Sequence, residues 1–157
     1  MSEAREMMLR AVEISFDRMD AGFGGPFGVV IVKNGEVIAE GYNKVTSAND
    51  PTAHAEVSAI REACERLETF DLSGCEIYTS CEPCPMCLGA IYWARLDRIY
   101  YANTREDAAR IGFDDAHIYD EIPKDVADRK IPMVRVELEE AKRVFQAWDE
   151  KEDKVEY

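Results

Sequence analysis

The chain has 157 residues, of which 46% are apolar and 10% aromatic, an ordinary composition for one globular domain over residues 1–157. Lys and Arg number 19 against 32 Asp and Glu, a formal charge of −13, so general nucleic-acid binding is not expected. The longest notable apolar run, Phe27 to Val32, is far shorter than the ~20 residues of a membrane helix. Charged side chains within the first ten residues do not fit a secretory signal. We therefore expect a cytoplasmic protein without membrane association.

Apolar spacing, turn residues and β-branched runs predict alternating helices and strands. In chain order they are helix 3–20, strands 27–33 and 36–42 around an Asn34-Gly35 turn, helix 53–69, strand 76–79, helix 85–93, strand 97–102, helix 104–111, strand 132–136 and helix 137–149. This order favours an α/β fold with three α/β/α layers around a mixed five-stranded sheet. A right-handed crossover makes strands 76–79 and 97–102 parallel.

The five cysteines point to a site rather than to a disulfide framework. Their number is odd, and three of them, Cys81, Cys84 and Cys87, stand within seven residues. In a reducing compartment such a cluster indicates a metal or redox site. A Cys-x-x-Cys pair alone, here Cys84 and Cys87, leaves these two alternatives about equal.

An upstream His54-Ala55-Glu56 shifts the balance towards a metal. His54, Cys84 and Cys87 provide three zinc ligands and leave a fourth position for water, which is typical of a catalytic zinc site. His-x-Glu followed by Pro-Cys-x-x-Cys is the signature of zinc deaminases, with the glutamate as proton carrier. His54 and Cys84 each stand at the start of a predicted helix, near strand ends where sites gather in such sheets. Residues two apart in a regular helix point about 200° apart, so His54 and Glu56 converge only over a helix end.

The remaining cysteines and the second histidine have structural interpretations. Cys64 lies on an apolar helix stripe and Cys75 begins a strand, so both are expected in the core. Cys81 is expected to be a buried thiol beside the site, and His117 to face solvent.

The whole chain resembles the small bacterial-type guanine deaminases of the cytidine-deaminase-like zinc superfamily. The motifs that carry the resemblance are Gly24-Gly25-Pro26-Phe27-Gly28, Asn49 to Glu56, Tyr78 to Ala94, Gly112-Phe113-Asp114-Asp115 and Phe145-Gln146-Ala147-Trp148. The first three are shared widely with cytosine and tRNA-adenosine deaminases. The Phe113-Asp114-Asp115 stretch and the ending Glu156-Tyr157 look like the guanine branch.

The resemblance implies one zinc ion per chain and the hydrolytic deamination of guanine to xanthine and ammonia, with Glu56 as the proton shuttle. It also implies that Asn43 binds the base, that Phe27 and Trp93 wall the pocket, and that Asp115 contacts the purine or the departing amine. Ala55 is expected among the substrate-binding residues.

Each substrate contact has a structural alternative. Asn43 fits a turn residue at a strand end, and Phe27 and Trp93 fit core aromatics. Either Asp114 or Asp115 fits a helix cap.

Considered alone, the charged tail from Asp149 to Tyr157 is a solvated terminus. The resemblance implies instead a homodimer in which residues 137–157 cross to a second subunit and Tyr157 closes the partner's pocket.

Rival functions are a deaminase of guanosine, of another nucleobase or of tRNA adenosine, and a zinc or redox module without turnover. A tRNA enzyme must neutralise phosphates with basic side chains, which the net charge of −13 disfavours. A redox module leaves His54-Ala55-Glu56 without a purpose.

Overall fold

The computed structural model describes residues 2–157 in two compact units, the first ending at Ala116 and the second comprising His117–Tyr157. No helix within residues 2–157 is long and apolar enough to cross a membrane. The three predicted metal ligands, His54, Cys84 and Cys87, lie in the first unit.

The predicted first helix and hairpin are confirmed. Helix α1 spans Glu3–Asp20, and Ser2 caps it by accepting a hydrogen bond from the Arg5 backbone N–H. Strands β1 (Gly28–Lys33) and β2 (Glu36–Tyr42) follow.

The turn between these strands has the predicted residues. Asn34 and Gly35 have φ values of 50° and 78°, as a type I′ turn requires. The two strands pair antiparallel, with an irregularity in register between Ile31 and Val32.

The elements around the site follow in the predicted order, with one addition. They are α3 (Ala55–Leu67), β3 (Cys75–Cys81), α4 (Pro85–Trp93), β4 (Arg98–Asn103) and α5 (Arg105–Arg110). The addition is the single-turn helix α2 (Val45–Ala48), in a stretch for which no helix or strand is predicted.

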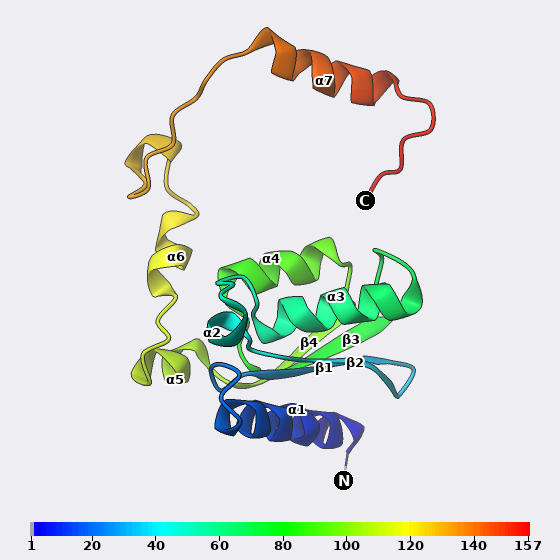
Figure 1. The fold of residues 1–157 in the computed structure, drawn as a ribbon, viewed down its shortest axis with the longest axis vertical. Coiled ribbons are helices and arrows are strands. Elements are labelled where there is room, and N and C mark those ends of the chain that lie inside the picture. The colour runs from blue at the N-terminus through cyan, green and yellow to red at the C-terminus, as the bar shows by residue number, and fades with distance from the viewer. Residues whose placement is uncertain (1) are drawn as a thin grey trace. The chain divides into compact units, whose positions relative to one another are not determined.

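The sheet has the order β2-β1-β3-β4, in which β1 pairs antiparallel with β3 and β3 pairs parallel with β4. Helix α1 covers one face, and α3 and α4 cover the other (Figure 1). The three layers and the parallel β3–β4 pair are as predicted.

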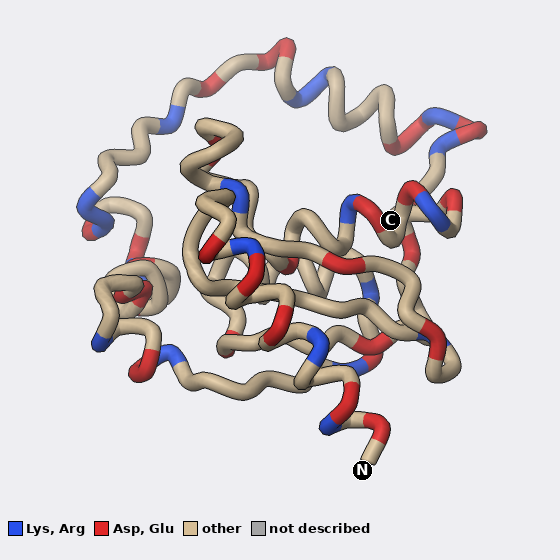
Figure 2. The backbone as a smooth tube through the Cα atoms, turned by 60° about the horizontal axis from the view of Figure 1, so that its bottom comes forward, with Lys and Arg blue, Asp and Glu red and all other residues tan. Residues whose placement is uncertain are grey.

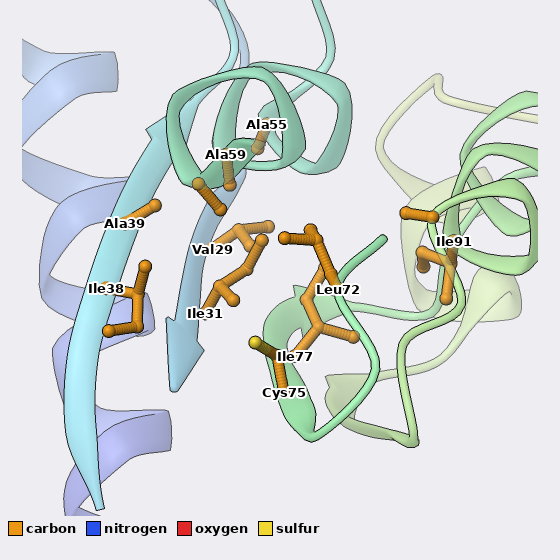
Figure 3. Close-up of a cluster of buried hydrophobic side chains, with 12 residues drawn as sticks. Val29, Ile31, Ile38, Ala39, Ala55, Ala59, Leu72, Cys75, Ile77 and Ile91 are labelled. Carbon is orange, nitrogen blue, oxygen red and sulfur yellow. The ribbon is translucent and has the colours of Figure 1, made fainter. Parts of the chain in front are cut away.

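Strand alternation sends side chains to both faces. Val29, Ile31 and Ile77 pack with Ala55 and Ala59 of α3 in the larger buried cluster (Figure 3). On the other face, Val30, Val32 and Tyr78 pack with Ala11 of α1.

The prediction of a fifth strand at 132–136 is wrong, since the sheet formed by residues 2–157 has four strands. Residues 132–136 do form a stretch without helix, and Val134 and Val136 are 83% and 74% exposed. An alternating apolar pattern identifies extended backbone, but a strand exists only where a neighbour completes its hydrogen bonds.

The second unit contains little else that is regular. It holds most of α6 (Ala116–Glu121), a 3₁₀ turn (Val126–Asp128) and α7 (Glu139–Glu150). Helix α7 confirms the helix predicted at 137–149. None of its residues is buried.

Candidate active site

Three donor side chains come together where two helices begin. The Sγ atoms of Cys84 and Cys87 lie 3.5 and 3.4 Å from Nδ1 of His54. One ligand atom from each residue lies within 4.8 Å of the others. The structure thus brings together the three predicted ligands, which are 30 or more residues apart in the sequence.

Local backbone geometry explains the convergence. His54 is the N-cap of α3, with extended φ and ψ of −70° and 158°, and Cys84 is the N-cap of α4. Pro85 has a fixed φ suited to the first helical position, so α4 starts directly after Cys84. Cys87 then follows within the first turn and returns to the same helix end.

The electrostatics of the trio fit a metal dication. The Cys84 thiol raises the pKa of His54 through a hydrogen bond. Hydrogen bonds from Cys87 and His54 hold the pKa of Cys84 well below that of an ordinary thiol. The same hydrogen bond with Cys84, together with burial, raises the pKa of Cys87, so the two thiols share one negative charge. Two sulfur atoms at the N-terminus of α4 and an imidazole at the N-terminus of α3 form a donor set that suits a divalent cation such as zinc, whose charge favours both thiolates. Three protein donors leave one tetrahedral position for a water or substrate.

Glu56 lies beside this trio. His54 precedes α3, and Glu56 is the second residue of the helix. The two side chains are therefore not held about 200° apart, as they would be within a regular helix. Its side chain is 7% exposed, and its Oε1 accepts a hydrogen bond of 3.2 Å from Thr79 Oγ1. Burial raises the pKa of the Glu56 carboxyl, which suits a group that takes and returns a proton. No sequence pattern indicated this contact of Thr79.

Asn43 and Phe27 occupy neighbouring positions at the ends of β2 and β1. The Asn43 backbone N–H donates to the Phe27 carbonyl at 3.3 Å, and Lys44 N–H donates to the carbonyl of Ala53, beside His54. The ring of Phe27 packs edge-on against Phe113, with centroids 4.9 Å apart. Phe113 was missed as a site residue, although it stands in a stretch that resembles the guanine branch.

Asp114 and Asp115 have different roles. Asp114 Oδ1 accepts from the N–H of Ala116, the first residue of α6, so the Asp114 side chain supports the start of this helix. Asp115 is half-buried, and burial, together with negative charge at Cys84, raises its pKa. Of the two aspartates, Asp115 is the one whose pKa responds to the charge of Cys84.

The predicted substrate contacts Ala55 and Trp93 differ in how far their side chains are exposed. Ala55 is fully buried, and its methyl group belongs to the core, so only its backbone can face a ligand. Trp93, the last residue of α4, is 66% exposed.

The other cysteines and His117 agree with their structural interpretations. Cys64 and Cys75 pack in the larger core cluster. Cys81 is buried, with Sγ 3.7 Å from the Thr104 carbonyl and outside the ligand trio. His117 is exposed.

Comparison with known proteins agrees with this arrangement. The cytidine and deoxycytidylate deaminase zinc-binding region matches residues 1–103, which contain the His54, Cys84 and Cys87 trio. The chain belongs to this deaminase family. Its members bind zinc, and the donor trio provides the place for it.

Two relatives show how far the similarity extends. A guanine deaminase of Bacillus subtilis (strain 168) is 57% identical over 148 residues, which cover 94% of this chain and 95% of the relative. A tRNA-specific adenosine deaminase of Aquifex aeolicus is 41% identical over 97 residues, covering 62% of each chain.

Solved structures of related deaminases also differ in how much of this chain they match. The crystal structure of the Bacillus subtilis guanine deaminase matches with a TM-score of 0.95 and 55% identity over 98% of both chains. A guanine deaminase from Nitrosomonas europaea matches with a TM-score of 0.67 and 35% identity, covering 69% of this chain and 63% of the other. The cytidine-deaminase-like fold is therefore established for this chain.

Proposed function

We propose that this protein hydrolyses guanine to xanthine and ammonia. The observation that carries the proposal is the similarity to the Bacillus subtilis guanine deaminase, which spans 94% of the chain and so includes most of the second unit. The matched region of the Aquifex aeolicus tRNA-specific adenosine deaminase covers only 62% of the chain. The similarity to the guanine deaminase therefore extends over more of the chain than the similarity to the tRNA enzyme, which favours guanine over a tRNA adenosine as the substrate.

In this proposal His54, Cys84 and Cys87 hold the zinc ion. Bound zinc lowers the pKa of water, so that a nucleophile is available at neutral pH. Glu56 accepts the proton of the attacking water and delivers it to the ring nitrogen beside the carbon that carries the amine. It then helps to protonate the departing amine, so that water and guanine give xanthine and ammonia. The burial of Glu56 and the raised pKa of its carboxyl support this role.

The pocket beside the trio is proposed to be lined by Phe27, Asn43 and Trp93. The packing of Phe27 against Phe113 gives an aromatic wall at the end of β1. Asn43 is 7% exposed and directly follows the neighbouring strand β2, where an amide can bind a base edge. The exposed ring of Trp93 can cover a ligand from the side of α4.

Asp115 and the backbone of Ala55 complete the proposed contacts. Asp115 is half-buried, and its raised pKa reflects the negative charge at Cys84 as well as burial. It can receive the departing amine or the polar edge of the purine. Ala55 lies in the first turn of α3, where backbone N–H groups have no acceptor within the helix.

We further propose a homodimer in which residues 137–157 cross to a second copy and Tyr157 closes the partner's pocket. Two features support exchange. Strand β4 is the edge of the sheet, and most of its residues are exposed. Helix α7 carries Val144, Phe145 and Trp148, which are 66%, 81% and 44% exposed. An edge strand and an apolar helix face both gain from a partner.

We propose that the enzyme works in the cytoplasm without a nucleic-acid or membrane partner. All five cysteines are free thiols, which a reducing compartment preserves. Basic residues are scattered singly or in pairs along the chain, interspersed with acidic ones (Figure 2). This pattern offers no dense basic segment for a phosphate backbone.

The decisive experiment measures ammonia release by zinc-loaded protein from guanine, guanosine, adenine, cytosine and cytidine. We expect guanine to be the best substrate. A higher kcat/KM for guanosine or for another base would refute the substrate assignment. A salt-sensitive shift of tRNA in a gel would favour the tRNA reaction, and a reversible Cys84–Cys87 disulfide without metal would favour a redox module.

A further inference from the structure

The side-chain amide of Asn43 forms hydrogen bonds through its oxygen and none through its nitrogen among the described residues. Its Oδ1 accepts two backbone hydrogen bonds, from Gly25 N–H at 3.3 Å and from Val45 N–H at 3.0 Å. Both donors are N–H groups, so the atom that faces them is the oxygen. The bond from Val45 is the strand-end turn expected of an asparagine. The turn interpretation of Asn43 is therefore correct for its oxygen and leaves the nitrogen to be explained.

The nitrogen is the end that lacks a protein acceptor. Asn43 is 93% buried, since its exposed fraction is 7%, and Nδ2 donates no hydrogen bond within residues 2–157. Among the described residues no buried side-chain nitrogen or oxygen lacks a partner, so Nδ2 is an atom of Asn43 that solvent reaches, and a ligand bound there can provide the acceptor in place of water. The amide thus presents a donor, and no acceptor, to whatever binds beside it.

Gly24 packs against Asn43 too closely for any side chain. A Cβ added at Gly24 would lie 2.4 Å from the Asn43 backbone oxygen and 2.5 Å from Asn43 Oδ1. The φ of Gly24 is outside the left-handed range, so a methyl group there would act through this contact rather than through backbone strain. A side chain at position 24 must displace the oxygen that orients the amide.

Gly25 links the same loop to the aromatic wall. Its N–H is one of the two donors to Asn43 Oδ1, and a Cβ on it would approach the rings of Phe27 and Phe113 at 3.1 and 3.2 Å. One pair of glycines therefore contacts both the amide and the two rings.

We propose that Gly24 and Gly25 are positioning residues that lock the Asn43 amide with its N–H group towards the substrate, so that the site selects a base with a hydrogen-bond acceptor at that edge. This proposal rests on the proposed function, because it assumes that the ligand beside Asn43 is the deaminated base. A ring that offers a donor or a C–H at this edge leaves the Asn43 N–H unpaired, which weakens binding by roughly 10- to 100-fold.

The first test compares Gly24→Ala with Gly89→Ala. Both add one methyl group, but at Gly89 nothing lies within 4 Å. Each zinc-loaded variant is assayed on the base that the wild type deaminates best. We expect Gly24→Ala to retain one zinc per chain while kcat/KM falls roughly 10- to 100-fold through KM more than through kcat, and Gly89→Ala to match the wild type. Equal kcat/KM in the two variants would overturn the positioning role and leave the guanine assignment intact.

The second test uses Asn43→Asp, which keeps an oxygen for the two backbone donors and replaces the free N–H by an acceptor. Competitive inhibition is measured with guanine analogues that each lack one acceptor of guanine, namely 2-aminopurine (no 6-oxo group), 7-deazaguanine (no N7) and 3-deazaguanine (no N3). In the wild type one analogue should bind more weakly than guanine, and this difference should vanish in Asn43→Asp and shrink in Gly24→Ala. Unchanged discrimination in both variants would contradict the proposal.

The outcomes separate this proposal from the function on which it rests. If the wild type prefers another base, the guanine assignment fails, and the Gly24→Ala effect is measured on that base. If no base is deaminated, a crystal structure of zinc-loaded Gly24→Ala decides. A displaced Asn43 side chain would support the positioning role, and an unmoved one would refute it.

Discussion

Thr79 Oγ1 lies 3.2 Å from Glu56 Oε1 and 2.8 Å from the Cys81 carbonyl oxygen. Thr79 is 2% exposed on β3, and Glu56 is 7% exposed on α3. A hydroxyl has one proton to donate and also accepts. It can donate to the Glu56 carboxylate, or accept from the protonated carboxyl while donating to the Cys81 carbonyl. Thr79 therefore satisfies Glu56 in both protonation states.

Replacing Thr79 by Val should lower kcat about tenfold. The loss of a hydrogen bond to a buried carboxyl costs about 1–3 kcal/mol, and about 1.4 kcal/mol is a factor of ten in rate. Thr79→Ser keeps the hydroxyl and should recover most of the activity. Steady-state kinetics with zinc content measured on each sample tests this. Equal kcat for Val and Ser variants would show that the hydroxyl does not support Glu56.

Glu56→Gln should retain one zinc per chain and lose roughly 10²–10⁴ in kcat, because the amide cannot carry the proton. Metal analysis and ammonia release on the same preparation test both parts. Normal turnover would remove Glu56 from the mechanism, and loss of zinc would show that its role is structural.

Cys87→Ser should lose zinc and lower the melting temperature, since a metal that binds only the folded state stabilises it. The matched control is Cys64→Ser, a thiol of α3 outside the trio. Zinc analysis and thermal unfolding with and without a chelator compare the two variants. If both variants kept zinc, Cys87 would not be a ligand.

Tyr78 should make the protein less stable at high pH. Burial, together with the neighbouring Tyr100, raises the pKa of Tyr78 to about 12 from an ordinary value of 10.0. In the unfolded chain the phenol ionises at the lower pH, so the native state loses relative stability as the pH rises from about 10 to about 12.

Tyr78→Phe should flatten this loss, because phenylalanine does not ionise. Urea unfolding of both proteins at pH 9, 10 and 11 gives the comparison. Tyr100 stacks on Tyr78 with centroids 4.4 Å apart. Tyr100→Phe is therefore the control, since it removes a hydroxyl from the same pair of rings and leaves the Tyr78 phenol in place. Parallel stability curves for Tyr78→Phe and the wild type would contradict the expectation.

Deleting residues 150–157 should reduce turnover much more than it reduces the melting temperature of the first unit. The deleted residues include Tyr157 but no part of the sheet or of the zinc trio. Mixing this deletion variant with a Glu56→Gln variant should restore activity if each tail serves the other subunit. An undiminished rate in the deletion variant alone would reject the closing role of Tyr157.

The sequence by itself determined the elements and the chemistry that rest on short-range rules. The Asn34-Gly35 turn, the Pro85 start of α4 and the donor types of the trio follow from individual side chains and their spacing. Ser2 and Gly112 similarly mark helix limits, with Gly112 at a φ of 100° after α5. These features need no knowledge of distant residues.

Only the tertiary structure decided what depends on a neighbour far along the chain. Thr79 became a partner of Glu56 because the fold brings the Thr79 hydroxyl of β3 within 3.2 Å of the Glu56 carboxyl at the start of α3, and nothing in the residues around Thr79 indicates this. The oxygen of Asn43 is fixed by Gly25, which lies 18 residues away. Residues 132–136 have the pattern of a strand without a partner within the four-stranded sheet. A pattern shows which groups need hydrogen bonds, whereas the fold decides which atoms provide them.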